Sequence, residues 1–188
     1  MLFRSTFLPE WAWECAHDHG LMMLVHLMRR DSLSDPLNYE EIRKKALRYP
    51  NARLMLDHCG RGFNARTIIE GVNYVRDLKN VYFDTSSICE IPPMAAVLKG
   101  AGLDRVVFGS DFPLTQMRGR SITAGDGFIW LTNENVDWKS YKGLCAPVLL
   151  GIENLRALLQ TAELLGMNRS DMENLFYHNA VAMTSGRK

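Results

Sequence analysis

Four short apolar segments, spaced about one strand-helix unit apart, constrain the fold of this 188-residue chain more than any other feature. They cover residues 21–25, 53–56, 81–83 and 105–108. Each is a nearly continuous apolar run rather than an alternating one, which is typical of strands in a parallel sheet that is covered on its faces. Helix-length stretches separate them. This order predicts an α/β fold built from right-handed strand-helix-strand crossovers.

Helix start and stop signals lie between the expected strands. Asn38 followed by Glu41 has the spacing of an N-cap with a carboxylate at the third helical position, and Asn64 can cap the following helix. A capping-box pattern at residues 170–173 opens the last helix, so two helices are expected to close the chain. The expected helices cover residues 9–18, 38–49, 64–78, 94–99, 152–165 and 171–183.

Each expected strand ends in a polar residue that does not suit the dry interior of a sheet. These residues are His26, His58, Asp84 and Asp111, and successive ones are 26 to 32 residues apart. In parallel strand-helix folds, the carboxyl ends of the strands lie at one face, where ligands bind. We therefore expect two imidazoles and two carboxylates to face a common space.

The candidate metal ligands are His26, His58 and Asp111. Imidazole is the commonest side chain for holding zinc, and the Asp111 carboxylate can ligate a metal or take a proton from metal-bound water. Gly109 allows another group to approach the backbone just before Asp111. The alternatives are that the histidines only form hydrogen bonds with their neighbours and that Asp111 caps the next loop.

Two other polar features have structural interpretations. Asp84 precedes a Thr-Ser pair and fits a turn or a helix cap. His17 and His19 lie at the end of the expected helix 9–18. A parallel crossover needs about a dozen residues, whereas the strand at Leu21 follows almost at once, so these histidines cannot end a neighbouring parallel strand.

The composition excludes several classes of function. The formal charge is +1, from 22 basic and 21 acidic side chains, so we expect no nucleic-acid or anionic-membrane partner. The longest apolar stretch, residues 21–25, is too short to span a bilayer, and the start lacks a secretory segment, so a cytoplasmic location is expected. The four cysteines form no C-x-x-C pair and are expected to be buried, reduced thiols. No linker or low-complexity tract divides the chain, so residues 1–188 are expected to form one domain.

Residues 114–146 are polar, aromatic and glycine-rich, with no clear period. We expect this segment to be an excursion across the face that holds the strand ends. Arg118 and Arg120 lie near its start and would suit a substrate carboxylate, because guanidinium binds carboxylate through a two-pronged fork. The alternative for both is a solvated loop cation.

Several motifs, taken together, resemble the later strand ends of the amidohydrolase-related family, which includes the α-amino-β-carboxymuconate-semialdehyde decarboxylase-like enzymes. The resemblance runs from about Pro9 to Met183, in the family's order and at its spacing. The motifs are Val-His-Leu at 25–27, Leu-Asp-His-Cys-Gly at 56–60, Tyr-Phe-Asp-Thr-Ser at 82–86, Phe-Gly-Ser-Asp-Phe-Pro at 108–113 and Asn-Leu-Phe-Tyr-His-Asn-Ala at 174–180.

The resemblance implies a partial (β/α)8 TIM barrel with about four parallel strands and two C-terminal helices. His26 resembles the fifth-strand metal ligand of the family. His58 resembles the sixth-strand histidine that polarises the substrate or acts as acid or base, and it could also ligate the metal. Asp111 resembles the eighth-strand aspartate that binds metal and handles the proton of the attacking water. The implied cofactor is a divalent metal, most simply zinc, and the implied reaction is hydrolysis of an amide or ester-like bond in a small molecule.

The chain also departs from the family pattern. Family members begin with a strand that ends in H-x-H, which supplies two metal ligands, and three further strand-helix units follow it. We expect this chain to hold only the C-terminal half of the barrel, to bind metal weakly or not at all, and to be impaired as an enzyme. Its unpaired strand edges predict a homodimer or larger assembly. Non-oxidative decarboxylation and a non-catalytic interaction module are the alternatives, and a nucleotide-binding open sheet is disfavoured because no Gly-rich turn follows a strand.

Overall fold

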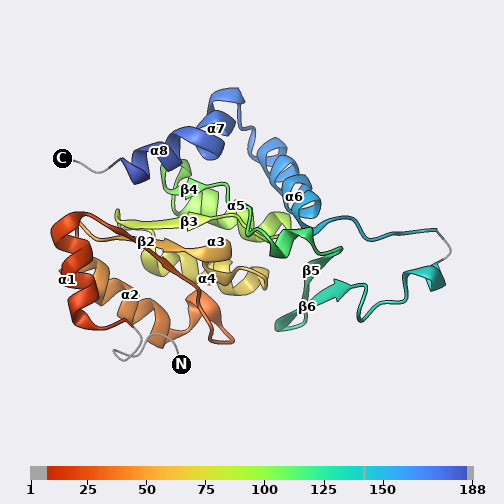
Figure 1. The fold of residues 1–188 in the computed structure, drawn as a ribbon, viewed down its shortest axis with the longest axis horizontal. Helices are drawn as coiled ribbons and strands as arrows, with labels where there is room; N and C mark the ends of the chain where they lie inside the picture. Colours follow the sequence, from red (N-terminus) through yellow and green to blue (C-terminus); the bar gives the residue numbers. More distant parts are fainter. Residues whose placement is uncertain (1–7, 142, 186–188) are drawn as a thin grey trace.

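The computed structural model describes residues 8–141 and 143–185. Its main sheet consists of four parallel strands in the order of the chain. These are β1 (Met22–Val25), β2 (Arg53–Leu56), β3 (Val81–Asp84) and β4 (Val106–Val107). The α/β fold and the four strands predicted from the apolar segments are confirmed, and β1 and β4 form the two edges of the sheet (Figure 1).

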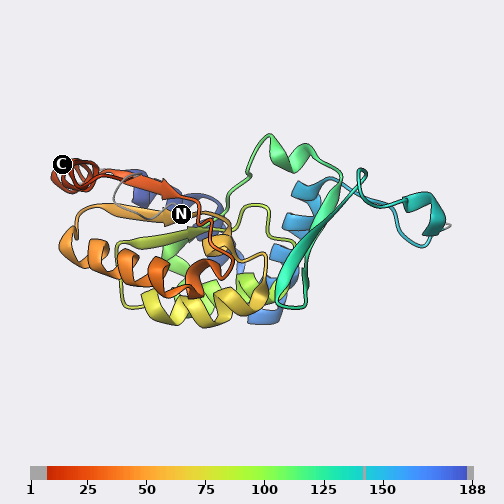
Figure 2. The same ribbon diagram turned by 90° about the horizontal axis from the view of Figure 1, so that it is seen from below.

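Helices cover one face of this sheet. Figure 2 shows α2 (Pro36–Arg48), α4 (Ala65–Val75) and α5 (Ile91–Gly100) on the same side of the strands. The strand residues that face them, which include Leu54, Leu56, Val81 and Phe83, are between 0 and 1% exposed and belong to the main hydrophobic core. Burial of this face holds the strand register and so fixes where each strand ends.

The second face of the sheet is only partly covered. Met55 and Val107 pack against Met183 of the last helix, α8 (Asn179–Thr184), in a small separate cluster. Leu24 of β1 lies on the same face as Met22 because strand residues alternate, yet its side chain is 69% exposed. The side of the sheet nearest β1 is therefore open to solvent in the described part of the chain.

Helices lie near both ends of the described part of the chain. The first described helix, α1 (Glu10–His19), ends at Gly20 in the left-handed conformation, so His17 and His19 are helix-terminal residues as predicted. The closing part consists of α6 (Leu150–Leu165), α7 (Arg169–Glu173), a π turn at Asn174–His178, and α8. Short helical turns fill the loops at Ser32–Ser34, Asp57–Arg61 (α3), Leu103–Arg105, Leu114–Gln116 and Trp138–Tyr141.

Two predicted helix caps were wrong by a few residues. The side chain of Asp35, not that of Asn38, caps α2, where it accepts a hydrogen bond from the backbone N–H of Leu37. Asn38 instead lies inside the helix, and its buried amide donates to the carbonyl of Ser32. Asn168, three residues before Asp171, forms the capping box of α7. The predicted cap of α4 at Asn64 is confirmed.

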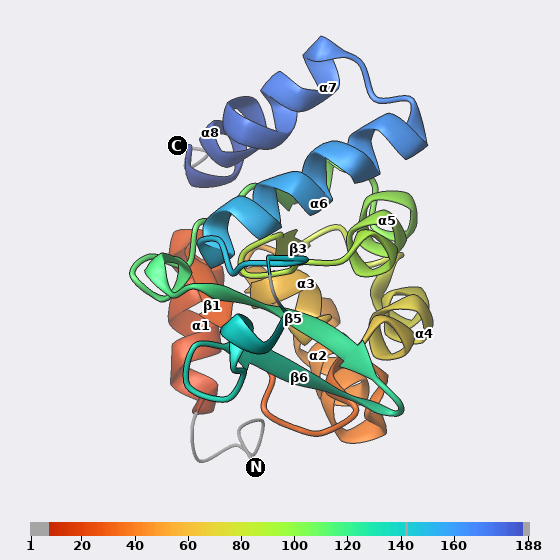
Figure 3. The same ribbon diagram turned by 90° about the vertical axis from the view of Figure 1, so that its right-hand side faces the viewer.

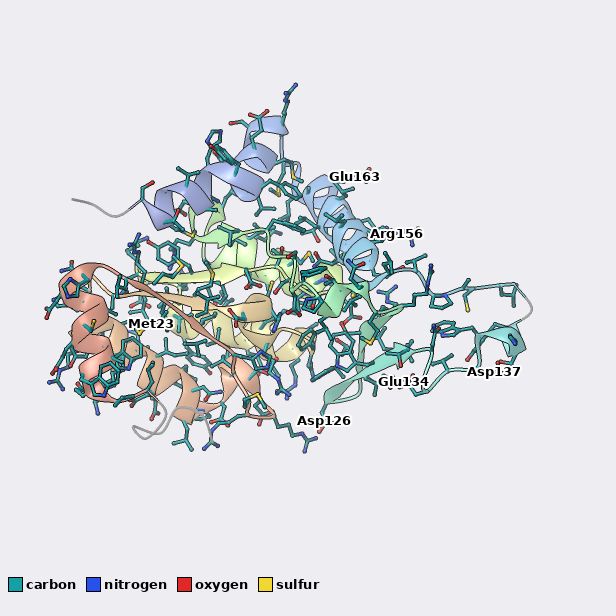
Figure 4. The ribbon with its side chains drawn as sticks, viewed as in Figure 1. Met23, Asp126, Glu134, Asp137, Arg156 and Glu163 are labelled. Carbon is teal, nitrogen blue, oxygen red and sulfur yellow. The ribbon has the colours of Figure 1, made fainter. Side chains whose placement is uncertain are left out.

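Residues 114–146 contain regular structure that the sequence analysis missed. They form an antiparallel hairpin of β5 (Gly119–Ala124) and β6 (Gly127–Thr132). Figure 3 shows this hairpin in front of the end of the main sheet, so the expected position over that face is confirmed. The stretch beyond the hairpin, which carries Glu134 and Asp137, projects away from the body (Figure 4).

The expectation for the cysteines was half right. All four are free thiols, and Cys59 and Cys89 are buried as expected. Cys15 and Cys145 are exposed, because they lie on the outer side of α1 and on the projecting segment. In residues 8–141 and 143–185, no helix is both long enough and apolar enough to cross a membrane.

Buried polar side chains connect the loops at the ends of the strands. Arg105 is only 3% exposed. Its guanidinium donates hydrogen bonds to four backbone carbonyls, those of Arg76, Leu78, Val81 and Ala101. Asn154 and Asn179 each hold two further carbonyls in the same way. These bonds satisfy backbone groups that the sheet leaves unpaired.

We predict that Arg105→Met destabilises the fold by about 3 kcal/mol, because the buried carbonyls lose the charged guanidinium that donates hydrogen bonds to them. Urea denaturation followed by circular dichroism measures the change. Arg169→Met is the matched control, because the Arg169 side chain is 93% exposed and its ion pair among the described residues is with Glu173. The control should leave the midpoint unchanged, and equal midpoints for the two variants would contradict the prediction.

Candidate active site

The carboxyl ends of the four strands bring together the side chains predicted to meet there. The ring centroids of His26 and His58 lie 5.0 Å apart, with the rings edge to face. The Nδ1 atom of His58 is 3.9 Å from a carboxylate oxygen of Asp111. Gly109 lets the end of β4 lie close to the end of β3, because a Cβ atom there would lie 3.0 to 3.1 Å from the side chains of Ser86 and Asp84. The expected common space therefore exists.

The hydrogen bonds around His58 determine its tautomer. The hydroxyl of Ser86 donates to Asp84 Oδ1 at 2.6 Å, so its oxygen accepts from His58 Nδ1, which lies 2.8 Å away. The other two groups near Nδ1, the Ser86 carbonyl and the Asp111 carboxylate, are also acceptors. Nδ1 therefore carries the proton, and Nε2 of the neutral ring keeps its lone pair. Among the described residues, Nε2 has no hydrogen-bond partner.

Asp84 has the turn-forming role predicted for it and a second role as well. Its Oδ1 accepts from the backbone N–H of Ser86 at 2.9 Å, which closes the expected turn. The same oxygen accepts from the backbone N–H of His58 at 2.9 Å, so Asp84 also links the ends of β2 and β3.

An unusual backbone turn follows β2. His58, Cys59, Gly60 and Arg61 all have φ between 52 and 66°, in the left-handed region. Non-glycine residues there cost about 1–2 kcal/mol each, so the surrounding packing has to hold the turn. Cys59 is fully buried, and a Cβ atom on Gly60 would lie 3.3 Å from Leu33. The turn directs both His58 and Arg61 toward the site region.

Three carboxylates lie close together beside the two histidines. Burial, reinforced by the charges of Asp84 and Asp111, raises the pKa of Asp57 to about 6. One oxygen of Asp57 is buried without a hydrogen-bond partner. Burial also lowers the pKa of His26, with smaller contributions from His58 and Arg61. The site therefore favours a neutral His26 and holds an excess of unpaired negative charge.

The donors in this cluster suit a divalent metal in kind but not in arrangement. Two imidazoles and carboxylates are the usual ligands of catalytic zinc. However, the described residues contain no group of three His, Cys, Asp or Glu side chains placed to hold one ion. His26, His58 and Asp111 therefore do not make a complete metal site by themselves.

The arginines proposed for a substrate carboxylate have other partners. Arg120 donates to the carbonyl of Cys89 at 2.7 Å and pairs with Glu153 at 3.3 Å. Arg118 donates to the carbonyl of Pro147. Their substrate-binding role stays a prediction. In this structure Arg118 links the start of the hairpin to the chain that returns from it, and Arg120 ties β5 to the loop before α5 and to α6.

Aromatic residues near His58 were not identified from the sequence. The ring of Phe63 lies 5.3 Å from that of His58, and the hairpin rings of Phe128 and Trp130 lie 5.0 and 5.1 Å from Phe63. The signal that could have located them is the Ala-Gly-Asp-Gly turn at residues 124–127, which is typical of a hairpin between apolar strands.

A cavity lies at the opposite end of the sheet from the candidate site. It has a volume of about 720 Å³ and is lined by residues at the starts of β2 and β3, among them Arg53 and Asn80, and by His17 and His19. None of the four strand-end residues lines it. The candidate catalytic side chains and this cavity are therefore at different ends of the strands, and we place the candidate site by its chemistry.

The fold is a partial TIM barrel, and its candidate site lies at the carboxyl ends of the strands. A family model described as amidohydrolase matches residues 8–183, so the chain belongs to the amidohydrolase family. No curated protein sequence matches the chain.

Solved structures of amidohydrolases have the same fold. An amidohydrolase from Burkholderia multivorans is 14% identical with a TM-score of 0.62, over 97% of this chain and 58% of that one. A second crystal form of that amidohydrolase, with bound zinc, gives a TM-score of 0.61 at 14% identity, over 97% and 58% of the two chains. A putative 2-pyrone-4,6-dicarboxylic acid hydrolase from Pseudomonas putida is 16% identical with a TM-score of 0.52, over 91% and 54%. The chain thus spans little more than half the length of these structures.

We predict that Asp57→Asn changes how stability depends on pH. The folded pKa of about 6 exceeds the ordinary 3.8, so the folded protein binds more protons than the unfolded one between these values. Wild-type stability therefore loses a contribution from Asp57 as pH rises through this range, and the variant does not. His26 acts in the opposite direction but is present in both proteins, so it cancels in the comparison.

Thermal unfolding of metal-free protein at pH 4, 5, 6 and 7 provides the measurement. The stability of Asp57→Asn should rise relative to wild type as pH increases. Asp137→Asn, on the projecting segment, is the control and should run parallel to wild type. A constant difference between Asp57→Asn and wild type at all four pH values would show that the prediction is wrong.

Proposed function

We propose that this chain carries the proton-transfer part of a metal-dependent hydrolase that cleaves amide or ester-like bonds in a small molecule. The single observation that supports this most is the contact of His58 Nδ1 with the Ser86 hydroxyl oxygen, 3.9 Å from the Asp111 carboxylate, which leaves Nε2 without a partner among the described residues. A neutral imidazole fixed in this tautomer can accept a proton at Nε2 and then donate it.

Asp111 and His58 have different tasks in this proposal. Asp111, which accepts a hydrogen bond from the hydroxyl of Ser87, would take the proton of the attacking water. His58 would stabilise the oxygen that gains negative charge, or protonate the leaving group. The Ser86 hydroxyl and Asp84 hold the His58 ring in position for this.

The metal contribution of this chain would come from His26, His58 and Asp111, with zinc as the simplest candidate. Zinc is the ion bound in one of the structurally similar amidohydrolases. Because the three donors do not converge on one point, we expect the chain alone to hold zinc weakly. The cytoplasmic location predicted from the sequence remains part of the proposal, and decarboxylation and a non-catalytic module remain the alternatives.

Zinc content and turnover test this function together. After dialysis we expect less than one zinc per chain by elemental analysis. In excess zinc we expect slow hydrolysis of 4-nitrophenyl acetate, and His58→Asn or Asp111→Asn should lower its rate by about 10²–10⁴-fold, the usual contribution of general acid-base catalysis. Asparagine is suitable because both positions have positive φ, which asparagine tolerates.

His19→Asn is the matched control, since His19 ends α1 at the far end of the sheet. Equal rates for all four proteins, with or without zinc, would overturn the hydrolase proposal and favour the non-catalytic module. One tightly held zinc per chain would overturn the expectation of weak binding. Carbon dioxide release from simple aromatic acids, without ester cleavage, would favour decarboxylation.

We also propose that the chain associates with a second copy of itself through β1. This strand is an edge of the sheet, and Leu21, Leu24 and Met28 on or beside it are 47, 69 and 50% exposed. Exposed apolar strand edges favour association. Light scattering should give the mass of a dimer or larger assembly, and Leu24→Lys should shift it toward the monomer, whereas Leu164→Lys on the exposed side of α6 should not. A monomeric wild-type protein would reject this proposal.

A further inference from the structure

The cavity at the amino-terminal ends of β2 and β3 is separate from the candidate active site. Its volume of about 720 Å³ lies within the range of about 300–1,000 Å³ that is usual for small-molecule sites. It is enclosed by the ends of α1 and α2, the loop that precedes β3, and α8, at the end of the sheet that α1 flanks (Figure 1). No residue proposed for catalysis lines it, so a ligand bound there would not depend on the proposed hydrolase reaction.

The backbone carbonyls at this end of the sheet are held by two side chains. The carboxyl end of a helix has unpaired carbonyls with partial negative charge, which by themselves favour a cation. The amide of Asn80 donates to the carbonyls of three residues around the end of α2 at distances between 2.9 and 3.2 Å. The guanidinium of Arg53 donates to the carbonyls of Gly20, at the end of α1, and Met183 of α8. These hydrogen bonds offset the negative ends of the three helices.

The charged side chains around the cavity leave an excess of positive charge. Arg53 and Lys79 line it, and neither has a carboxylate within ion-pair distance in the described part of the chain. Asp77 also lines it but is held by both terminal nitrogens of Arg43 at 2.6 and 3.0 Å. These hydrogen bonds lower the pKa of Asp77 and so keep it ionised and paired. Asp18 is then the single lining carboxylate that faces two unpaired cations.

Two further side chains at the cavity can donate hydrogen bonds. The Nδ1 atom of His17 accepts from the backbone N–H of Asn51 at 3.1 Å, so the ring is neutral and carries its proton on Nε2. Tyr82 alternates along β3 with two core residues, so its ring lies on the face of the sheet opposite to α2 and α4. Its hydroxyl has no hydrogen-bond partner within residues 8–141 and 143–185. Apolar lining comes from Ala46, Leu47, Leu78 and Ala182.

We propose that this cavity binds a small molecule through a phosphate group, with Arg53 and Lys79 as the charged ligands and His17 and Tyr82 as neutral donors. Three of the five N–H groups of Arg53 remain after its two bonds to carbonyls. A phosphate has about two negative charges and accepts hydrogen bonds in several directions, which suits donors from four separate elements better than a planar carboxylate does. The remaining volume and its apolar lining would hold the rest of the molecule.

Titration of inorganic phosphate into ¹⁵N-labelled, metal-free protein at constant ionic strength tests the proposal by NMR. We expect saturable shifts of the amide signals of Gly20, Asn51 and Asn80. Lys79→Gln should weaken phosphate binding about threefold, as expected for an exposed charge, and Tyr82→Phe about twofold to fivefold, as expected for one hydrogen bond.

Two further variants complete the comparison. Arg53→Met should weaken phosphate binding about tenfold or more, because it removes a partly buried charged donor. Lys99→Gln is the matched control for Lys79→Gln, because Lys99 is also an exposed lysine but lies at the end of α5 and does not line the cavity. Its phosphate affinity should equal that of the wild type.

Several results would overturn the proposal. These are the absence of saturable shifts up to tens of millimolar phosphate, shifts confined to residues outside the cavity, and wild-type affinity in both Lys79→Gln and Tyr82→Phe. Acetate, titrated in the same way, should bind at least several-fold more weakly than phosphate, and equal binding would reject the phosphate assignment. If Arg53→Met does not fold, as judged by the dispersion of its spectrum, the comparison of Lys79→Gln with Lys99→Gln decides.

Discussion

The carboxylate of Asp84 is the contact on which the geometry of the candidate site depends most. One of its oxygens accepts hydrogen bonds from the backbone N–H of His58, the backbone N–H of Ser86 and the hydroxyl of Ser86. Because that hydroxyl proton is committed to Asp84, the Ser86 oxygen can only accept from His58. A single carboxylate thus joins two strand ends, orients an imidazole and selects its tautomer.

The same contact explains how a costly backbone turn is tolerated next to the site. The N–H of His58 would otherwise be left unpaired where the chain leaves β2 and enters the left-handed turn. Packing of Cys59 and the close approach of Gly60 to Leu33 hold the rest of the turn. The cost is local, whereas the interactions that offset it come from β3 and from the loop after β1. The turn thereby holds the His58 ring beside Ser86 and Asp111.

The contrast between local signals and distant contacts determines how much of the fold and the site could be predicted from the sequence. The four strands follow from apolar runs, and the meeting of His26, His58 and Asp111 follows from the rule that parallel strand ends converge. The cap of α2 was predictable in principle, since Asp35 followed by a proline is a stronger start signal than Asn38. The left-handed conformation of His58 was not, because no residue pattern specifies it and its partners lie 26 and 28 residues away.

The hairpin covers one side of the site. Phe128 and Trp130 cover Phe63 and, through it, one side of His58, so water is excluded from part of the space around the carboxylates. A lower effective dielectric strengthens the repulsion from Asp84 and Asp111, which adds to burial in raising the pKa of Asp57. The hairpin, whose sequence has no clear periodicity, therefore changes the surroundings of charged residues that lie outside it.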